Sequence, residues 1–396
     1  MNSGVRIGIN LLAFEPGRSG GAELYARNLV AALARIDRVN EYVLFTNLDN
    51  DEAYRSVAPS FCVERIGIRS RPQFRRVLTE QLLLPVLAKR HRLAILHSPS
   101  YTWPLAALVP GVVTIPDMLY RSQPHFVEQP KLTFWRIFVP MSAWRCKKVL
   151  TISDHARRDI ARYLKVPISK IVVTPLAPIP MGAGAAAPGS EEATKILAQY
   201  RIAPPYVLTV AGLGKHKNTI SLVRALDLLQ RRNSLKQLSL VVTGNDYGAR
   251  DAIWTEIERL GLTHAVVLPG YVPARDLPTL YACAAAYASV SRFEGFGMTV
   301  LEAMACGAPV VISNCASLPE VAGDAAVVVD PDDTDALAGA LFTLIADPER
   351  RRDYVERGRN RVAQFSWDAT ARLTLDAYLE AGGVSSLAAE RDDRRA

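Results

Sequence analysis

Residues 291–313, SRFEGFGMTVLEAMACGAPVVIS, carry the most specific pattern of the sequence. Strand-forming residues end near Val290, and the glycine-flanked loop EGFG follows. A helix is predicted to begin near Met298 and to end at Gly307, because glycine is suited to the position after a helix. The apolar run APVVIS predicts the next strand. The stretch therefore predicts strand, glycine loop, helix and strand, which is the repeating unit of a doubly wound α/β domain.

Apolar, strand-forming segments alternate with helical segments on both sides of this stretch. The segments VRIGINLL, EYVLFTN, LAILH, GVVTIPD and KKVLTIS lie before residue 174; YVLTVAGLG, SLVVTG, AVVLPGYV, AAYASV and APVVIS lie after residue 190. This alternation predicts parallel sheets with helices on both faces. We expect the α/β class, with two Rossmann-like doubly wound domains that face each other across a cleft at the carboxyl ends of their strands.

A linker separates the two sets of strands. Residues 174–190, TPLAPIPMGAGAAAPGS, are dominated by Pro, Gly and Ala and show no helical or strand periodicity. We assign residues 1–185 to an N-terminal domain and residues 192–365 to a C-terminal domain. The last helix, about 366–385, is expected to pack back on the N-terminal domain.

Composition excludes several classes of protein. The 396 residues are 49% hydrophobic and 22% charged, which is typical of a globular chain rather than a disordered one. The five cysteines form no C-x-x-C pair, so neither a disulfide framework nor a cysteine zinc site is expected. No uninterrupted apolar run reaches about 18 residues, and the N-terminus does not resemble a secretory signal. These features predict a cytoplasmic protein.

The positive charge is concentrated in the first half of the chain. The net charge is +8, yet residues 1–190 carry 25 Lys and Arg against 13 Asp and Glu. The densest part runs from Arg65 to Arg92, where eight basic residues and the single acid Glu80 surround the apolar stretch LLLPVLA. Such a segment can lie on an anionic membrane or form a core helix with a solvated basic rim. Nucleic acid is disfavoured because aromatic residues do not interleave with the charge.

The glycine loop and the helix after it predict an anion site. The free N–H groups of Gly297, Met298 and Thr299 would point outward from the start of the helix, and the glycines would let a phosphate approach closely. Glu294 and Glu302 flank this position. Carboxylates beside a phosphate site suit a ligand that also has hydroxyl groups, one carboxylate for a ribose and one for a second sugar.

This stretch resembles the E-x(7)-E signature of glycosyltransferase family 4, whose members are retaining enzymes with the GT-B fold. The likeness extends over most of the chain, through GRSGGAELYARNLVAAL, TISDHARRDIARYLKVPISKIVV, GYVPARDLPTLYACAAAYASVSRFEGFG and SLPEVAGDAAVVVDPDD. It implies transfer of a hexose from a nucleoside-diphosphate sugar to a hydroxyl, without a metal or cofactor. Overall likeness to mannosyltransferase-like members favours mannose, carried by GDP or UDP.

The resemblance also implies roles for individual residues. Glu302 would bind the ribose hydroxyls, and Glu294 would hold hydroxyls of the transferred sugar close to the reacting carbon. The segment 270–272 would lie near the base. The remaining implied donor contacts are backbone groups of the glycine loop and helix start, and two glycines of the N-terminal loop: Gly295, Phe296, Gly297, Met298, Thr299, Gly20 and Gly21.

A basic loop follows the first strand of the second half. Residues 211–218, AGLGKHKN, contain Lys217 where the family places a lysine that neutralises the departing diphosphate. The family's earlier cation has no clear counterpart, because Leu213 stands where an arginine is common, and Lys215 is the substitute we consider. Without the glutamate signature, the loop would equally suit a basic surface turn.

The acceptor side departs from the family pattern. Many relatives have a histidine immediately before an aspartate in the segment equivalent to VVTIPDML, whereas this chain has Pro116 before Asp117. Asp117 is our candidate acceptor-side residue. His97 follows a predicted strand, and either a core role or a substrate contact is compatible with its position.

Other activities are less consistent with the sequence. GRSGG satisfies a hydrolase G-x-S-x-G pattern, but no late histidine is suitably placed for that mechanism. No H-E-x-x-H motif is present and no D-x-D is expected at a strand end, which disfavours a metal site and a metal-dependent transferase. A nucleotide-sugar epimerase of the same fold and a non-catalytic sugar-nucleotide-binding protein remain as alternatives.

The expected partners follow from charge and resemblance. A nucleotide-sugar is the donor, and a glycan or polyprenyl-linked glycan, as in cell-surface polysaccharide or lipopolysaccharide biosynthesis, is the acceptor. The basic first half also predicts peripheral contact with the anionic inner face of the plasma membrane.

Overall fold

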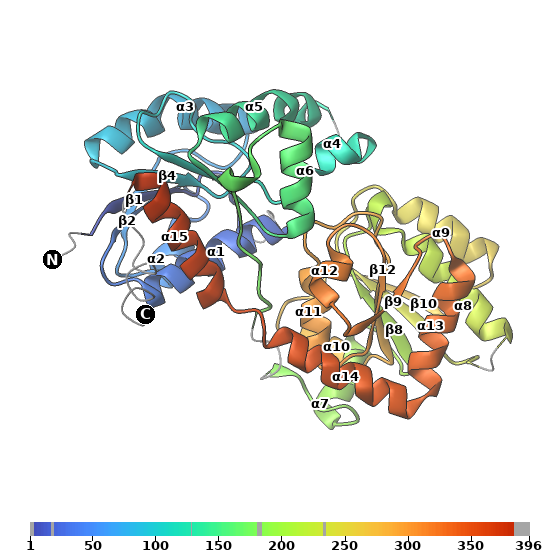
Figure 1. Ribbon diagram of the computed structural model, residues 1–396. Coiled ribbons are helices and arrows are strands. Elements are labelled where there is room, and N and C mark those ends of the chain that lie inside the picture. Colours follow the sequence, from blue (N-terminus) through green and yellow to red (C-terminus); the bar gives the residue numbers. More distant parts are fainter. Residues whose placement is uncertain (1–3, 17–19, 128, 180–183, 233–234, 384–396) are drawn as a thin grey trace, which may run out of the picture. The chain divides into compact units, whose positions relative to one another are not determined.

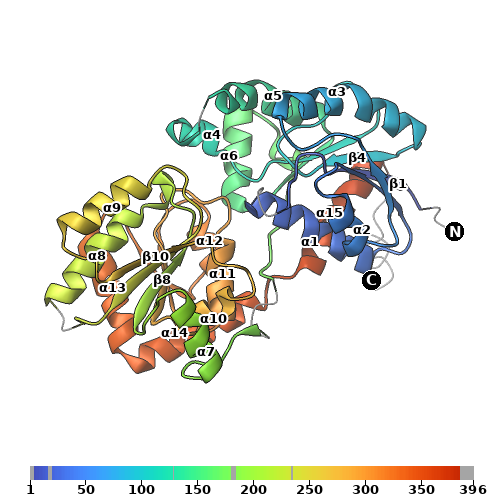
Figure 2. The same cartoon turned by 180° about the vertical axis from the view of Figure 1, so that it is seen from behind.

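The computed structural model describes residues 4–16, 20–127, 129–179, 184–232 and 235–383. The chain divides into two compact units, Met1–Leu176 with Ser366–Ala396 and Ala177–Phe365 (Figures 1 and 2). The first unit thus ends inside the Pro/Gly/Ala-rich stretch, earlier than the boundary at residue 185 that we expected. The last segment of the chain belongs to the first unit.

The first unit contains a seven-stranded parallel sheet. Its strands are β1 (Arg6–Asn10), β2 (Glu41–Thr46), β3 (Cys62–Arg65), β4 (Ile95–Ser98), β5 (Gly111–Thr114), β6 (Lys148–Thr151) and β7 (Ile171–Val173). They are ordered β3-β2-β1-β4-β5-β6-β7, so the direction of winding reverses between β1 and β4. The central strands are buried on both faces, as expected for a sheet covered by helices on each side.

Helices cover both faces of this sheet. They are α1 (Gly20–Ile36), α2 (Asp51–Val57), α3 (Gln73–Arg90), α4 (Leu119–Ser122), α5 (Lys131–Arg145), α6 (Asp154–Leu164) and α15 (Trp367–Gly382), with 3₁₀ turns η1 (Pro124–Phe126) and η2 (Ile168–Lys170). Buried side chains of α3, α5 and α6 share one core cluster with the sheet. Figure 1 shows α1 and α15 on the other side.

The C-terminal helix α15 is held against the first unit by specific contacts. The rings of Trp367 and Tyr25 lie 6.4 Å apart between centroids, and the Thr370 hydroxyl donates a hydrogen bond to the Pro175 carbonyl oxygen. Farther along α15, the hydroxyl of Tyr378 reaches His97 on β4. The last helix therefore completes the core of the unit in which the chain begins.

The second unit contains a six-stranded parallel sheet. Its strands are β8 (Tyr206–Val210), β9 (Ser239–Thr243), β10 (Val266–Gly270), β11 (Ala286–Ser289), β12 (Val310–Ser313) and β13 (Ala326–Val329), ordered β10-β9-β8-β11-β12-β13. Its helices are α7 (Glu191–Gln199), α8 (Thr219–Arg232), α9 (Arg250–Arg259), α10 (Leu277–Ala282), α11 (Met298–Ala305), α12 (Leu318–Ala322), α13 (Thr334–Ala346) and α14 (Pro348–Val362), with the 3₁₀ turn η4 (Lys215–Lys217). Winding reverses between β8 and β11.

The predicted α/β class with two doubly wound parallel sheets is confirmed. Three of the four edge strands, β3, β7 and β13, were not predicted. β3 (CVER) is at most half-buried and lacks the apolar run by which the central strands are recognised. β7 (IVV) and β13 (AVVV) are apolar, and their sequences alone would have allowed their prediction.

Candidate functional site

The candidate site lies in the second unit, where the winding of its sheet reverses. Ligands of open α/β sheets bind at such switch points, beyond the carboxyl ends of the strands. Lys217 follows β8 and Glu294 follows β11, and these two strands are neighbours in the sheet. The Lys217 Nζ atom lies 2.6 Å from Glu294 Oε1. The fold thus brings together two residues that are 77 positions apart in the sequence.

The lysine loop is fixed by the residue that follows it. Asn218 adopts a left-handed conformation with φ of 55°, which ends η4 and turns the chain into α8. Its side-chain amide donates to the Pro331 carbonyl oxygen at 2.8 Å. Within this loop Leu213 is buried, whereas Lys215 is exposed and Lys217 is half-buried. The loop therefore directs Lys217, rather than Lys215, to the glutamate.

Hydroxyl groups hold the loop that carries Glu294. Ser291 Oγ donates to Glu294 Oε1 at 2.9 Å, and Ser317 Oγ donates to the carbonyl oxygens of Glu294 and Phe296 at 2.8 and 3.0 Å. Burial alone would raise the pKa of the Glu294 carboxyl. The charge of Lys217 and the hydrogen bonds from Lys217 and Ser291 outweigh burial, so this pKa lies below its usual value. Glu294 is consequently an ionised carboxylate at neutral pH.

The glycine loop has the backbone geometry that its sequence predicts. Gly297 has φ of 99°, and a Cβ atom there would lie 2.7 Å from Leu318 Cδ2, so a larger residue would be both strained and obstructed. The chain enters α11 at Met298, and the half-buried Met298 and Thr299 form its first turn. The N–H groups of a first helical turn favour anions.

Aromatic side chains of the second unit contact the residues at the start of α11. Phe296 is buried, with its ring 5.9 Å from that of Phe365, which leaves its backbone rather than its ring for a ligand. The Tyr287 hydroxyl donates to Thr299 Oγ1 at 2.7 Å. The implied role of backbone groups at Gly295–Thr299 is thus compatible with the structure.

Glu302 occupies a different environment from Glu294. Its side chain is buried in α11, and its Oε2 atom accepts a hydrogen bond of 3.0 Å from the Tyr281 hydroxyl. Burial raises the pKa of Glu302 to about 7, and the bond from Tyr281 opposes the rise only in part. Near neutral pH this carboxyl is therefore partly protonated, whereas Glu294 is ionised.

Several residues of the site were not singled out by the sequence analysis. Ser291, Ser317, Tyr281 and Tyr287 each hydrogen-bond a candidate residue or its loop. Of these, Ser291 alone lies in the quoted signature stretch, where its position three residues before Glu294 is a usable signal. The other three approach through tertiary packing and leave no local pattern.

His216, between the two lysines of the basic loop, is held neutral. Burial, reinforced by the charge of Lys217, lowers its pKa to about 4. The Arg292 N–H donates to the His216 carbonyl oxygen at 2.8 Å, which joins the loop after β8 to the loop after β11. Of the three basic side chains in this loop, the two lysines therefore supply the positive charge at neutral pH.

In the first unit, the glycine loop before α1 is described only in part. Gly20 and Gly21 are the first two residues of α1, and residues 17–19 lie outside the described residues. A Cβ atom at Gly21 would meet nothing within 4 Å. The packing of the described chain therefore does not itself require glycine at position 21.

Asp117 follows β5 and is part of an aromatic cluster. Its Oδ1 atom accepts hydrogen bonds from the Tyr101 hydroxyl at 3.1 Å and from the Leu119 N–H at 3.0 Å. The Tyr101 ring stacks on Trp135 with centroids 4.5 Å apart. A carboxylate beside stacked aromatic rings is a suitable surface for a sugar, because it offers a hydrogen-bond acceptor next to an apolar face.

His97 is a core residue. Its side chain is buried between Tyr378, whose hydroxyl lies 2.7 Å from Nδ1, and Thr114, whose Oγ1 lies 2.8 Å from Nε2. Burial lowers the pKa of this imidazole to about 3. Of the two roles that the sequence left open, the structure shows the core one.

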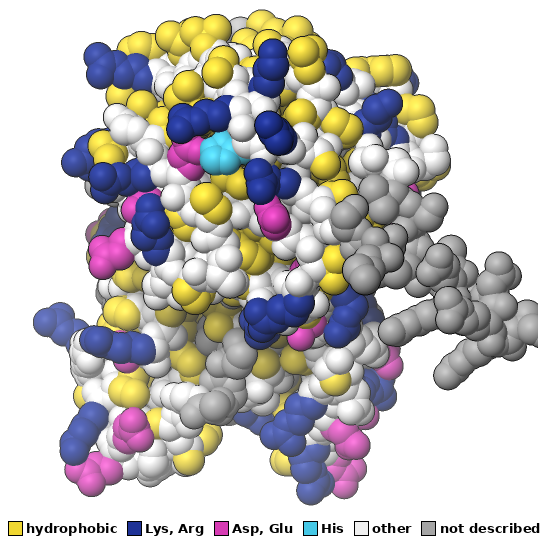
Figure 3. All heavy atoms as spheres, turned by 90° about the vertical axis from the view of Figure 1, so that its left-hand side faces the viewer, with side chains coloured by type: hydrophobic (Ala, Val, Ile, Leu, Met, Phe, Trp, Pro, Cys, Tyr) yellow, Lys and Arg dark blue, Asp and Glu magenta, His cyan; other side chains and the backbone are white. Residues whose placement is uncertain are grey.

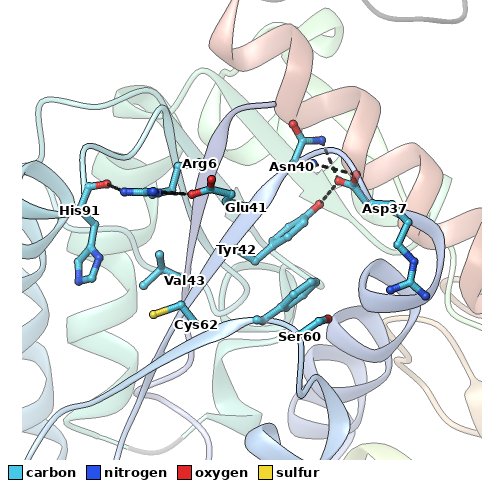
Figure 4. A pocket seen from close by; sticks show the side chains of 11 residues that line it. Arg6, Asp37, Asn40, Glu41, Tyr42, Val43, Ser60, Cys62 and His91 are labelled. Carbon is cyan, nitrogen blue, oxygen red and sulfur yellow. Dashed lines mark hydrogen bonds and ion pairs between the residues drawn. The ribbon is translucent and has the colours of Figure 1, made fainter. Parts of the chain in front are cut away.

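A polar pocket of about 440 Å³ lies elsewhere in the first unit, at the amino ends of β1, β2 and β3 (Figure 4). Three of its charged groups, those of Arg6, Glu41 and Asp37, already have partners. The Arg6 guanidinium pairs with Glu41 and donates to the His91 carbonyl oxygen, and Asp37 accepts from Asn40 and Tyr42. This pocket lies at the edge of the sheet opposite to the carboxyl ends, and we do not assign the function to it.

One expectation about metal binding is wrong. Asp330 and Asp332 directly follow β13, so a D-x-D does lie at a strand end, where Asp332 is paired with Arg292. Among the described residues, no group of three or more His, Cys, Asp or Glu side chains is arranged to hold a metal ion. Within the same part of the chain, no helix is both long enough and apolar enough to span a bilayer.

Proteins of known families resemble both units of the chain. Two protein-family models match: Glycosyltransferase Family 4 over residues 19–177 and Glycosyl transferases group 1 over residues 194–361. The chain is 33% identical over 285 residues to O-antigen chain mannosyltransferase B of Escherichia coli, an alignment that covers 72% of this chain and 74% of that protein.

Solved structures share the fold. The Anabaena protein HepE in complex with UDP-glucose superposes with a TM-score of 0.72 at 19% identity, covering 94% of this chain and 98% of that one. WaaG, a glycosyltransferase involved in lipopolysaccharide biosynthesis, gives 0.70 at 16% identity, with 93% and 98% covered. These likenesses confirm the predicted GT-B class. Because two successive family models account for both units and the E. coli relative aligns with nearly three quarters of each protein, the chain belongs to glycosyltransferase family 4.

Proposed function

We propose that this glycosyltransferase moves a hexose, with retention of anomeric configuration, from a nucleoside-diphosphate sugar to a hydroxyl group of a glycan. The observation that carries the proposal is the Lys217–Glu294 pair at the switch point of the second sheet, beside the start of α11. A sugar diphosphate requires positive groups for its phosphates and an acceptor for its hydroxyls. The cation and the free helix N–H groups would bind the phosphates, and the ionised carboxylate would accept hydrogen bonds from the hydroxyls.

Each group has a distinct task in this proposal. The N–H groups at the start of α11 and the ammonium of Lys217 hold the diphosphate and stabilise the charge that develops as it leaves. Glu294, kept ionised by Lys217 and Ser291, accepts hydrogen bonds from hydroxyls of the transferred sugar. Glu302 accepts those of the ribose. When the donor binds, the contact between Lys217 and Glu294 is replaced. Lys217 then contacts the phosphate of the donor, and Glu294 contacts its sugar.

The chemical step needs no side-chain base. The bond between the anomeric carbon and the phosphate oxygen breaks, and a bond from the acceptor oxygen forms on the same face of the sugar. The acceptor proton passes to the departing phosphate oxygen, and a nucleoside diphosphate leaves. Neutral His216 and ionised Glu294 then keep their protonation states throughout. We propose that the reaction requires neither metal nor cofactor, since Lys217 supplies the positive charge.

We favour mannose as the transferred sugar and GDP as its carrier. The E. coli relative is named a mannosyltransferase. The HepE structure contains UDP-glucose, so a UDP-sugar is the second donor to test. The proposed acceptor is a glycan or polyprenyl-linked glycan of O-antigen or lipopolysaccharide synthesis on the cytoplasmic side of the membrane. Asp117, with Tyr101 and Trp135, is the proposed acceptor-side cluster.

The proposal is tested by incubating the purified chain with each nucleotide-sugar, with and without mannose oligosaccharides, in the presence of EDTA. We expect an acceptor-dependent product whose new linkage has the same anomeric configuration as the donor by NMR. Conversion of the donor without acceptor would identify an epimerase instead. Tight donor binding with no product for any acceptor would identify a binding protein. Loss of activity in EDTA that a divalent metal restores would contradict the metal-independent mechanism.

A further inference from the structure

Helix α3 carries a stripe of apolar side chains on its outer surface. Phe74, Leu78, Leu82 and Val86 are 68%, 57%, 65% and 60% exposed. They recur every four residues, which places them on one face of the helix. The opposite face already buries apolar residues against the sheet. The packing of the first unit therefore accounts for the inner face of α3 and leaves the outer one unexplained.

Helix α5 adds a second stripe. Ile137, Met141 and Trp144 are about half exposed, at the three- and four-residue spacing of one helical face. An apolar groove of about 480 Å³ lies between the two helices, lined mainly by Phe74, Leu78, Val77, Phe134 and Phe138. Both cartoon views show α3 and α5 side by side on the outside of the first unit (Figures 1 and 2). We call this surface the α3–α5 face.

The charges on these two helices have one sign. Lys131, Arg136 and Arg145 lie on α5, which contains no acidic residue. On α3 the exposed charges are Arg75, Lys89 and Arg90, and its single acid, Glu80, is buried and paired with Arg76 at 2.7 Å. Figure 3 shows hydrophobic side chains gathered along its upper edge, with Lys and Arg side chains among them.

We propose that the α3–α5 face lies on the surface of an anionic lipid bilayer. The apolar stripes and the groove would enter the boundary between headgroups and acyl chains, and the basic side chains would reach the lipid phosphates. An exposed apolar surface of this extent indicates an interaction site. Charge complementarity favours a bilayer over a protein partner, because the exposed charges of the two helices are exclusively positive. The inference deepens the proposed function by giving the enzyme access to a lipid-linked acceptor.

This face combines features of the two interpretations that the sequence allowed. The basic segment Arg65–Arg92 suggested either a membrane-surface helix or a core helix with a basic rim. In the structure α3 is a core helix on its inner side and also has an apolar outer side. The contribution of α5 was not predicted, because its apolar residues are spread around the helix and are not concentrated on one face.

Flotation of the full chain with vesicles tests the proposal. The vesicles are phosphatidylcholine alone or an equal mixture of phosphatidylcholine and phosphatidylglycerol. We expect binding to the anionic vesicles only, and weaker binding as salt is added. A triple variant of the stripe, Leu78→Gln, Leu82→Gln and Val86→Gln, should abolish it. Leu373→Gln on α15, which replaces an exposed leucine of the same unit, is the matched control and should bind like the wild type.

A second variant separates charge from apolar contact. Each basic residue near an anionic surface changes partitioning by about fivefold, so Arg75→Gln, Arg90→Gln and Arg136→Gln together should weaken binding about a hundredfold. Its control replaces three exposed arginines of the second unit: Arg250→Gln, Arg275→Gln and Arg352→Gln. Wild-type binding by both face variants, or no binding of the wild type to anionic vesicles, would overturn the proposal. Self-association through the face without lipid would also overturn it.

The activity of these variants on a soluble acceptor distinguishes this inference from the proposed function. All substituted side chains are exposed and lie outside the donor site, so transfer to a soluble glycan should equal that of the wild type. If the wild type transfers no sugar to any acceptor but still floats with anionic vesicles, the proposed function fails and the membrane face stands.

Discussion

The two sheets reverse their winding at equivalent places, but the side chains at the two places differ in kind. Beyond β8 and β11, Lys217 and Glu294 are charged, and 19% and 16% of their side chains remain exposed. At β1 and β4, Asn10, Ser98 and His97 are neutral and buried. The same topology thus produces an accessible charged site in one unit and a sealed polar core in the other.

The sealed core of the first unit owes part of its closure to α15. Tyr378 of that helix covers His97, and Tyr25 of α1 shares Thr114 with it. A topological switch point therefore gives only the place where a ligand can bind. The charges and the free hydrogen-bonding groups left there decide whether one does.

Removing the negative charge of Glu294 from the charged site should have the largest effect on activity. Glu294→Gln keeps the shape of the side chain and removes its charge, so both the contact with Lys217 and the proposed contact with the sugar weaken. We expect kcat/KM to fall on the order of a thousandfold, as when a group that stabilises the transition state is removed. Steady-state kinetics measure this, with circular dichroism to show that the variant is folded. Activity within tenfold of the wild type would move the reacting centre elsewhere.

Removal of the cation should have the next largest effect. Lys217→Met retains the aliphatic part of the side chain but removes the charge that neutralises the departing diphosphate. We expect kcat/KM to fall about a hundredfold, mainly through kcat. Lys215→Met, at the exposed lysine of the same turn, is the matched control and should change the rate only a few fold. Equal losses in the two variants would show that the loop acts through its overall charge.

Glu302 should make the second unit less stable as pH rises. Its pKa of about 7 in the folded chain exceeds the ordinary 4.5, so between these values the folded chain keeps a proton that the unfolded chain releases. Stability is therefore lost as pH rises through this window, by about 2–3 kcal/mol. Urea unfolding of the wild type and Glu302→Gln at pH 5 and pH 8 measures the difference. Parallel pH profiles would show that Glu302 is not buried.

His97 should make the first unit less stable as pH falls, which is the opposite of the effect of Glu302. Its pKa of about 3 lies below the ordinary 6.5, so the folded chain releases a proton that the unfolded chain keeps. Its contribution is present above pH 6.5 and is lost as pH falls. Between pH 6.5 and 5 the wild type should lose about 2 kcal/mol more than His97→Gln.

The kinetic consequence of His97→Gln separates the two regions further. The variant should be less stable at pH 7 because a buried hydrogen-bonded ring is lost, while kcat at a temperature where it is folded should stay near the wild-type value. A kcat loss comparable with that of Glu294→Gln would return His97 to the reaction and contradict its assignment to the core.

Local backbone chemistry explains what the sequence could predict. The positive φ of Gly297 and the helix that begins at Met298 follow from residues within one short stretch. The strand order of a doubly wound sheet then places the loop of Lys217 beside that of Glu294, although 77 positions separate them. Pattern was therefore sufficient for the fold class and for the glycine loop, whereas Lys217 was singled out by resemblance to the family and its contact with Glu294 was not predicted.

Tertiary packing decided the rest. Tyr281 reaches Glu302 from α10, and nothing in the sequence around it predicts that contact. The burial of His97 depends on Tyr378, which lies 281 positions later in the chain. Exposure was equally hidden, since the apolar residues of α3 that face the sheet and those that face outward are of the same kinds.

The most direct test of the donor site is a thermal-unfolding series of the wild type and Glu302→Gln with GDP-mannose, UDP-glucose and the corresponding ADP- and dTDP-sugars. A ligand at 100 times its Kd adds about 2.7 kcal/mol of stability. We expect one nucleotide class, GDP first, to stabilise the wild type by about this amount and to leave the unfolding midpoint of Glu302→Gln unchanged. Equal shifts in the two proteins, or none with any nucleotide-sugar, would contradict a donor site at the start of α11.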